Sequence, residues 1–248
     1  MSWHTQPMVA VDLETSSPDP ETARIVTAAV VHIDPRNGRD GITTRTWLVD
    51  PGIDIPAEAT DVHGISTQHA HEHGTDPAVA VYEIEQALQS AWVENTPIVL
   101  YNAPFDLTVL DRELRRHHDL GLDGIGPVVD PLVVDKTLDR YRKGSRKLTA
   151  VCEHHGIVLD DAHTANADAL AAARLAWALA VRYPDDVGDL HELQQLQVTW
   201  FAENASSFEL FLKRRKTQAG EPQDVIDAIA INRYWPLIPH HTEREPVF

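Results

Sequence analysis

The sequence predicts an α/β fold, and three observations lead to that prediction. Three strand-like segments near the N-terminus are joined by short, turn-rich connections, which is typical of an antiparallel meander. Two further strand-like segments follow, each leading into a helical pattern. The 248 residues are 43% hydrophobic, enough to bury a substantial core in one large domain, or in a domain with an appendage.

The first three strands are expected at residues 8–15, 24–34 and 42–50. The first reads MVAVDLET, the second is rich in Ile and Val, and the third alternates between apolar and polar residues. An Asn37–Gly38 pair between the second and third strands is a hairpin signal. From residue 51 to residue 66 the pattern loosens, and no regular element is predicted there.

The later strands are expected at residues 97–101 and 127–130. Helices are expected where apolar residues recur at helical spacing; they cover residues 77–93, a segment from Pro104 onward, a segment ending at Leu138, and residues 148–155, 165–181 and 187–216. The last of these is expected to have at most one break. The Pro- and His-rich tail from residue 231 is expected to be a strap or disorder.

The charge and cysteine content restrict the classes of function. A formal net charge of −17 argues against a protein that coats nucleic acid by charge alone. Basic residues are nevertheless concentrated between residues 136 and 147, where six face a single acid, Asp139. One cysteine, Cys152, permits no internal disulfide, and no apolar targeting or membrane-spanning run is present, so a cytoplasmic protein is expected.

Two acidic residues stand at the end of the first strand. Asp12 and Glu14 are two residues apart, so both side chains point to the same face of the strand. Two like charges at this distance are costly unless a cation lies between them, and Mg²⁺ or Mn²⁺ prefers such oxygen ligands. The alternative, an exposed strand end whose acids face water, stays open on this evidence alone.

Two further acids begin helices. Asp106 falls in the first turn after Pro104, where the helix dipole favours a negative charge, but Val109 and Leu110 place it toward the apolar side. Asp168 begins a helix and heads an apolar row, so it also points toward packed surface. His163 is expected on the loop before that helix, facing the same pocket; a simple cap or surface role is the alternative.

Three motifs together carry a family resemblance. VDLET at residues 11–15, NAPFD at 102–106 and HTANAD at 163–168 resemble, in this order, the DEDDh branch of the DnaQ-like 3′-to-5′ exonucleases. That family includes the proofreading epsilon subunit of bacterial replicative DNA polymerase. The resemblance implies a ribonuclease H-like exonuclease domain over residues 1–183, with a mixed five-stranded sheet flanked by helices. Residues 184–248 then form a C-terminal helical extension and tail.

The resemblance also assigns roles to individual residues. Two Mg²⁺ or Mn²⁺ ions would be bound by four carboxylates, Asp12, Glu14, Asp106 and Asp168. His163 would act as general base, with Glu14 as its catalytic partner, and Thr15, His63 and Phe105 match positions that hold the terminal nucleotide. Such an enzyme hydrolyses the last phosphodiester of a 3′ end, expected to be single-stranded DNA, and releases nucleoside 5′-monophosphates in proofreading or repair.

Some features depart from the family or leave alternatives open. The family often continues its first motif with Thr-Gly, whereas Ser16 and Ser17 follow Thr15 here, which changes the following loop. No clamp-binding motif is recognised, so association with a DNA polymerase is an expectation of the family alone. An RNA-directed ribonuclease or a catalytically silent nucleic-acid-binding relative would carry the same motifs.

A basic loop is expected to hold the upstream phosphates of the substrate. Two clusters are candidates, residues 140–147 and residues 213–216. The first is preferred because it precedes the helix that leads to His163, and because Gly144 and Ser145 would keep it mobile. Within it, the side chains expected to contact the strand are Arg142, Lys143 and Arg146.

One histidine-rich segment also resembles a metal site. His69, His71 and His73 are spaced two residues apart, and such residues do not share a helix face. No cysteine or further ligand follows at zinc spacing. A solvated short helix or loop is therefore expected there.

Overall fold

The computed structural model describes residues 2–159 and 164–243, and its centre is a five-stranded sheet in the order β3-β2-β1-β4-β5. The strands are β1 (Met8–Thr15), β2 (Ile25–Ile33), β3 (Ile42–Leu48), β4 (Ile98–Val99) and β5 (Val128–Val129). β1, β2 and β3 pair antiparallel, whereas β4 and β5 are parallel to β1. The predicted mixed sheet, a meander with two added parallel strands, is confirmed.

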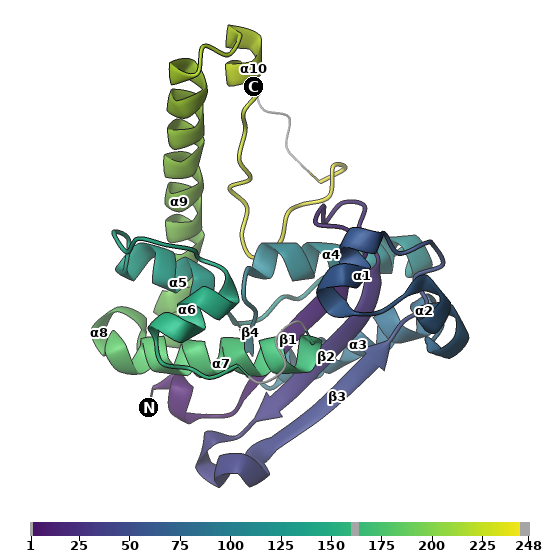
Figure 1. Cartoon of the computed structure of the whole chain (residues 1–248). Coiled ribbons are helices and arrows are strands. Elements are labelled where there is room, and N and C mark those ends of the chain that lie inside the picture. The colour runs from purple at the N-terminus through teal and green to yellow at the C-terminus, as the bar shows by residue number, and fades with distance from the viewer. Residues whose placement is uncertain (1, 160–163, 244–248) are drawn as a thin grey trace.

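Helices cover both faces of this sheet (Figure 1). On β1, Val9, Val11 and Leu13 enter the core formed with α3 (Pro77–Val93) and α4 (Ala103–His118). Met8 and Ala10 enter the opposite core, which α7 (Ala165–Arg182) covers. Because strand residues alternate between faces, Asp12 and Glu14 continue the Met8 and Ala10 side. Both acids therefore lie on the face that α7 covers.

The segment from residue 51 to residue 66, in which no element was predicted, contains the short helix α1 (Ala57–His63), and the histidine-rich segment that follows forms a second short helix, α2 (Thr67–His73). Local capping explains them: Gly64 ends α1 with a φ of 77°, and the Ser66 hydroxyl accepts the N–H of His69 at the start of α2. The hairpin between β2 and β3 is present, but its connection is a 3₁₀ segment, η2 (Pro35–Gly41), instead of a tight Asn-Gly turn.

The remaining helices complete the body and form the C-terminal region. They are η1 (Trp3–Thr5), α5 (Pro131–Leu138), α6 (Leu148–His154), α8 (Pro184–Val187), α9 (Leu190–Gln218) and α10 (Gln223–Asp227). The helix α9 is continuous, so the break allowed for in the sequence is not present. Figure 1 shows α9 projecting from the body with α10 beside its far end. Across the described residues, no helix is long and apolar enough to cross a membrane.

The start of α9 covers the outer edge of the sheet. The N–H of Val128 donates to Gln194 Oε1 at 2.9 Å, and the N–H of Asp130 donates to Gln197 Oε1 at 2.7 Å. Gln197 Nε2 in turn donates to the carbonyl oxygen of Val128 at 2.9 Å. An exposed edge strand would leave these backbone groups unpaired. Gln194 and Gln197 therefore pair with backbone groups at the outer edge of β5, as a neighbouring strand would.

The described part of the tail is a strap across α4. The N–H of Ile238 donates to Thr108 Oγ1 at 3.1 Å, and Arg112 Nη2 donates to the carbonyl oxygen of Ile238 at 3.0 Å. Arg115 forms an ion pair with Glu243 at 2.5 Å. Of the two alternatives for the tail, the strap is therefore the one found up to residue 243.

Candidate active site

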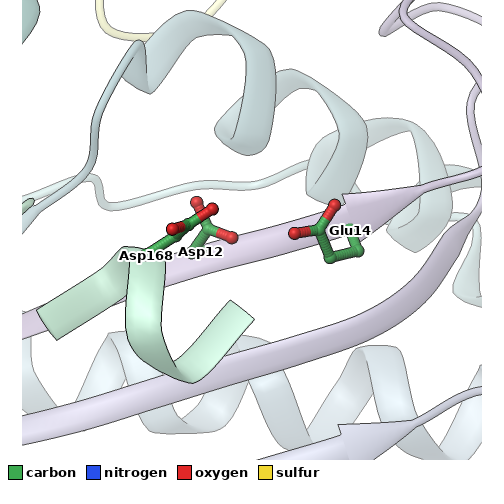
Figure 2. A group of neighbouring side chains, drawn as sticks. All are labelled: Asp12, Glu14 and Asp168. Atoms are coloured by element: carbon green, nitrogen blue, oxygen red, sulfur yellow. The ribbon is translucent and has the colours of Figure 1, made fainter. Parts of the chain in front are cut away.

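Three carboxylates meet where β1 ends and α7 begins. One oxygen from each of Asp12, Glu14 and Asp168 lies within 4.8 Å of the other two. Figure 2 shows the carboxylates of Asp12 and Asp168 beside one another, with Glu14 further along the strand. The strand supplies two acids on one face, and the first turn of α7 supplies the third. Residues 156 positions apart in the sequence thus form one acidic group.

A fourth carboxylate reaches the same strand from the other side. Asp106 lies in the first turn of α4 and is 6% exposed. Its Oδ1 accepts the backbone N–H of Leu13 at 3.1 Å, between the two acids of β1. β4 pairs with β1 only through Val9 and Ala10, so this N–H has no strand partner on that side. We call the four acids, Asp12, Glu14, Asp106 and Asp168, the acid cluster.

Asp130 fixes the start of α4 and so positions Asp106. Its Oδ1 accepts the N–H of Asn102 at 3.0 Å, and its Oδ2 accepts the N–H of Ala103 at 3.0 Å. Asn102 has a φ of 75°, a left-handed conformation that needs such support. Asp130 was not among the predicted site residues. The available signal was an acid directly after an apolar strand and before Pro131, the usual pattern of a helix cap.

The electrostatics of the acid cluster favour a bound cation. Burial, with the neighbouring charges of Asp106, Glu14 and Asp168 added, raises the pKa of Asp12 well above its usual value. Burial and then Asp168 raise the pKa of Glu14 to about 7. Within the described residues, no Lys or Arg side chain forms an ion pair with Asp12, Glu14 or Asp106. A donor set of carboxylate oxygens with uncompensated charge fits Mg²⁺ or Mn²⁺.

His63 and Glu14 line a common cavity of about 320 Å³. The N–H of Ile65 donates to His63 Nδ1 at 3.1 Å, which leaves Nε2 to carry the proton of the neutral ring. Burial lowers the pKa of His63 and so favours that neutral form. Nε2 is buried and has no hydrogen-bond partner among the described residues. The cavity beside Glu14 therefore contains an unused hydrogen-bond donor.

Two other predicted nucleotide contacts lie next to the acid cluster. Phe105 precedes Asp106 and packs, partly buried, against the α3–α4 core. Thr15 ends β1, and its hydroxyl donates to the carbonyl oxygen of Ser17 at 2.9 Å. Ser16, at a position where the family often has glycine, is buried and accepts the N–H of Arg24 at 3.0 Å. This hydrogen bond joins the two ends of the loop between Ser16 and Arg24.

His163, the predicted general base, lies outside the described residues. The described chain resumes at Thr164, the residue before α7, with Asp168 in the first turn of that helix. Its role therefore stays a prediction.

The predicted basic loop is folded against the protein. Arg142 Nη2 lies 2.7 Å from Asp135 Oδ2, and Arg146 forms an ion pair with the same carboxylate. Arg146 Nη2 also donates to the carbonyl oxygen of Asp139 at 2.6 Å. Asp135 is fully buried and requires these partners. The structure thus differs from the expected mobile loop, since two of its three predicted contacts hold Asp135, and Lys143 alone of the three is exposed.

The histidine-rich segment forms the short helix α2. His71 Nδ1 lies 2.9 Å from Asp50 Oδ2, and the rings of His69 and His73 are 4.9 Å apart. His69 also lines the cavity that His63 and Glu14 share. The segment is therefore a largely exposed short helix, one of the two alternatives expected, and its His69 lies at the same cavity as Glu14.

Comparisons with known proteins agree with this geometry. An exonuclease family model (RNase_T) matches residues 9–176. The PolC-type DNA polymerase III of Lacticaseibacillus paracasei is 27% identical over 173 residues, which are 69% of this chain and 11% of that protein. A DNA polymerase III subunit epsilon-like protein of Rhodobacter capsulatus is 34% identical over 141 residues, 54% of this chain and 19% of that protein.

The fold is also similar to that of E. coli exonuclease I, solved in complex with a dT13 oligonucleotide. The TM-score is 0.60 at 21% identity, and the match covers 73% of this chain and 42% of that chain. The chain thus spans less than half of the solved chain and less than a fifth of the two curated relatives.

The family match includes the three elements that carry the acid cluster: β1, α4 and the first turn of α7. It covers more than half of the chain. The predicted ribonuclease H-like fold and the resemblance to DnaQ-like exonucleases are both confirmed. This chain belongs to the exonuclease family and carries a DnaQ-like exonuclease domain.

Proposed function

We propose that this protein is a metal-dependent 3′-to-5′ exonuclease that removes nucleotides from single-stranded DNA. The acid cluster is the observation that carries the proposal. It brings four carboxylates together without a basic partner for Asp12, Glu14 or Asp106 among the described residues. The names of the relatives, PolC-type and epsilon-like DNA polymerase III proteins, support DNA as the substrate.

The acid cluster would hold two Mg²⁺ or Mn²⁺ ions. When bound, such ions lower the pKa of an attacking water and stabilise the leaving oxygen. His163, five residues before Asp168, takes the proton of that water. The water attacks the phosphorus of the last phosphodiester, the bond to the 3′ oxygen of the preceding nucleotide breaks, and a nucleoside 5′-monophosphate leaves.

Neighbouring residues would orient the terminal nucleotide. The Nε2–H of His63 offers a hydrogen bond beside Glu14, and Phe105 offers an apolar contact beside Asp106. Thr15 lies at the end of β1, one residue beyond Glu14. Lys143 is available for a more distant phosphate because its side chain is exposed. A cytoplasmic location, an association with a DNA polymerase, and a boundary near residue 183 between the exonuclease domain and its extension belong to the same proposal.

The central test is hydrolysis of end-labelled substrates. The 5′-labelled substrates are single-stranded DNA, paired duplex, mispaired duplex and RNA, each with Mg²⁺, with Mn²⁺ or with EDTA. Wild type should shorten single-stranded DNA from its 3′ end and require a metal ion. Asp12→Asn and Asp168→Asn should retain less than about 1% of the activity, since removing one ligand of a catalytic metal site typically removes the reaction. Asp185→Asn, an exposed acid on α8, serves as the matched control.

The outcomes distinguish a DNA exonuclease from an RNA-directed ribonuclease and from a silent binding relative. Faster shortening of RNA than of DNA would replace DNA by RNA as the substrate. Hydrolysis by Asp12→Asn above a few per cent of the wild-type rate would show that the acids do not bind the catalytic ions. Absence of hydrolysis in wild type with every substrate would favour a silent binding relative.

A second variant tests the base. His163→Gln should leave Mg²⁺ binding intact but reduce turnover by about 10²- to 10⁴-fold, the usual contribution of a general base. The loss should be larger near neutral pH than at high pH, where hydroxide replaces the base. Equal turnover in His163→Gln and wild type from pH 6 to 9 would assign His163 to the loop structure alone.

A further inference from the structure

We propose that a groove between α5, α9 and the returning tail binds the upstream nucleotides of the single-stranded substrate. This groove, here called the α5–α9 groove, is a cavity of about 480 Å³ whose lining includes Asn102, Lys136, Arg140, Phe201, Phe208 and Asn232. The inference rests on the proposed function and extends it. It assigns a role to a part of the chain that lies beyond the family match.

The charge of the groove is opposite to that of the whole protein. Lys136, Arg140 and Arg146 are among the lining residues, and none of the described lining residues is acidic. The formal net charge of the chain is −17, so the charge of the lining is opposite in sign to that of the chain as a whole. A polyanion is the complementary ligand.

Two of these cations form no ion pair with a described residue. Arg146 pairs with the buried Asp135, but neither Lys136 nor Arg140 forms an ion pair with a described residue. Arg140 Nη2 donates a hydrogen bond to Ser207 Oγ at 3.4 Å, a neutral group on α9. In the basic segment 136–147, Arg142 and Arg146 thus serve the fold, whereas Lys136 and Arg140 remain available to a ligand.

Aromatic side chains continue from the groove along α9. Phe208 lines the groove and is 51% exposed, and its ring stacks with that of Phe211 at 6.3 Å and 19°. The guanidinium of Arg215 lies 5.8 Å from the Phe211 ring. Residues spaced three and four apart share one helix face, so these three side chains form a continuous row. Exposed aromatic rings interleaved with cations are the stacking platforms used by proteins that bind single strands.

The groove and the acid cluster share the first turn of α4. Asn102 lines the groove, and Asp106 lies four residues later on the same helix. Four residues of an α-helix rise by about 6 Å along the helix axis. A strand whose 3′ end lies at the acid cluster can therefore enter the α5–α9 groove directly. The row Phe208, Phe211 and Arg215 would receive the nucleotides beyond it.

The test compares substrates that do and do not reach the groove. The first is dT12; the second is the p-nitrophenyl ester of thymidine 5′-monophosphate, which has no upstream phosphates. In Lys136→Gln/Arg140→Gln, the ratio of kcat/KM for dT12 to kcat/KM for the ester should fall at least tenfold. The slope of log KM for dT12 against log salt should fall by about 1.4, because each phosphate contact on a single strand contributes about 0.7.

The aromatic part of the groove is tested by binding. Affinity for fluorescently labelled dT12, measured by anisotropy in EDTA, should fall roughly 5- to 150-fold in Phe208→Ala, the range seen when one stacked base loses its aromatic partner.

The control for Lys136→Gln/Arg140→Gln is Arg36→Gln/Arg39→Gln, which removes the same number of positive charges from η2, between β2 and β3 at the far end of the meander. The control should leave dT12 binding and its salt slope within twofold of wild type.

The possible outcomes separate the groove from the catalytic proposal. Equal losses on dT12 and the ester would mean that Lys136 and Arg140 support the acid cluster, and the groove proposal would be wrong. Equal salt slopes in the groove variant and the η2 control would show that the effect depends only on net charge, and this result would also contradict the proposal. Unchanged dT12 binding in all groove variants would leave the exposed aromatic row to a protein partner. A wild type that binds dT12 through the groove but hydrolyses neither substrate would contradict the catalytic proposal alone.

Discussion

The charges of Asp135 and of the acid cluster are compensated in different ways. Asp135 is fully buried and pairs with Arg142 and Arg146, and His155 Nε2 lies 3.4 Å from its Oδ1. In the acid cluster, Asp106 is buried and the other three acids are partly buried, yet no described Lys or Arg forms an ion pair with Asp12, Glu14 or Asp106. The chain supplies its own counter-charge to Asp135. For the acid cluster, that charge has to come from outside.

The helix α4 contains the same contrast within sixteen residues. Asp111 pairs with Arg112 and Arg115, and Glu113 pairs with Arg116. Asp106, on the same helix, has only backbone N–H donors among its favourable contacts. A general shortage of arginines near α4 therefore does not explain the lack of an ion-pair partner for Asp106. The difference is specific to the end of the helix that faces β1.

The largest expected effect concerns the paired acid. Asp135→Asn keeps the shape of the side chain but removes the carboxylate that Arg142 and Arg146 share, and only Arg142 keeps a second ion pair, with Asp139 at 3.3 Å. Breaking a buried pair in this way typically costs about 3–5 kcal/mol of unfolding free energy. Asp106→Asn is the matched substitution in the acid cluster. Its amide oxygen can still accept the N–H of Leu13, so in EDTA it should be neutral or stabilising. Urea denaturation of both variants measures the difference, and the comparison fails if the two changes have the same sign and size.

The next effect concerns metal ions and stability. At a Mg²⁺ concentration of about 100 times its Kd, wild type should gain about 2.7 kcal/mol of unfolding free energy, because the ion binds the folded acid cluster. Asp12→Asn should lose most of this gain, whereas Asp135→Asn should keep it despite its lower starting stability. Thermal unfolding with and without Mg²⁺ gives both values. A similar gain in Asp12→Asn and wild type would place the ion elsewhere.

The parts of the molecule that the sequence predicts are those determined by local spacing. The alternation of β1 identified Asp12 and Glu14 as neighbours on one face, and the helical pattern after Pro104 placed Asp106 in a first turn. The order of the three motifs then indicated the family, and the family implied the five-stranded sheet. The short helix α1 was missed because a cap at Gly64, not an apolar stripe, defines it, whereas α2 lies where a short helix or loop was expected and begins after a cap at Ser66.

Partners that lie far apart in the sequence could not be predicted in this way. Asp130 supports the start of α4 across 28 residues, and Gln197 covers β5 across 69 residues. Neither contact leaves a periodic pattern in a single sequence. The same limit explains the basic loop. Its charge can be counted in the sequence, but the sequence does not show that Asp135 on α5 is buried and pairs with Arg142 and Arg146.

The smallest expected effect is a pH dependence that only the acid cluster should show. The pKa of Glu14 is raised to about 7, from an ordinary value of 4.5, by burial and by Asp168. As pH rises from about 4.5 to 7, the unfolded chain releases this proton before the folded chain does. The free energy of unfolding of the metal-free protein therefore falls between about pH 4.5 and pH 7. Below about pH 4.5 the carboxyl is protonated in both states and does not lower the free energy of unfolding.

Glu14→Gln removes that loss. In EDTA at pH 8 the variant should be more stable than wild type by about 1–3 kcal/mol, a range reduced for the partial solvent exposure of Glu14, and the difference should shrink toward zero near pH 4.5. With saturating Mg²⁺ the order should reverse, because the ion stabilises only the charged side chain. The control, Glu203→Gln on the exposed side of α9, removes a carboxyl outside the cluster. If Glu14→Gln and Glu203→Gln shift the pH profile of urea denaturation equally, the charge of Glu14 is already compensated, and the contrast between the acid cluster and Asp135 does not hold.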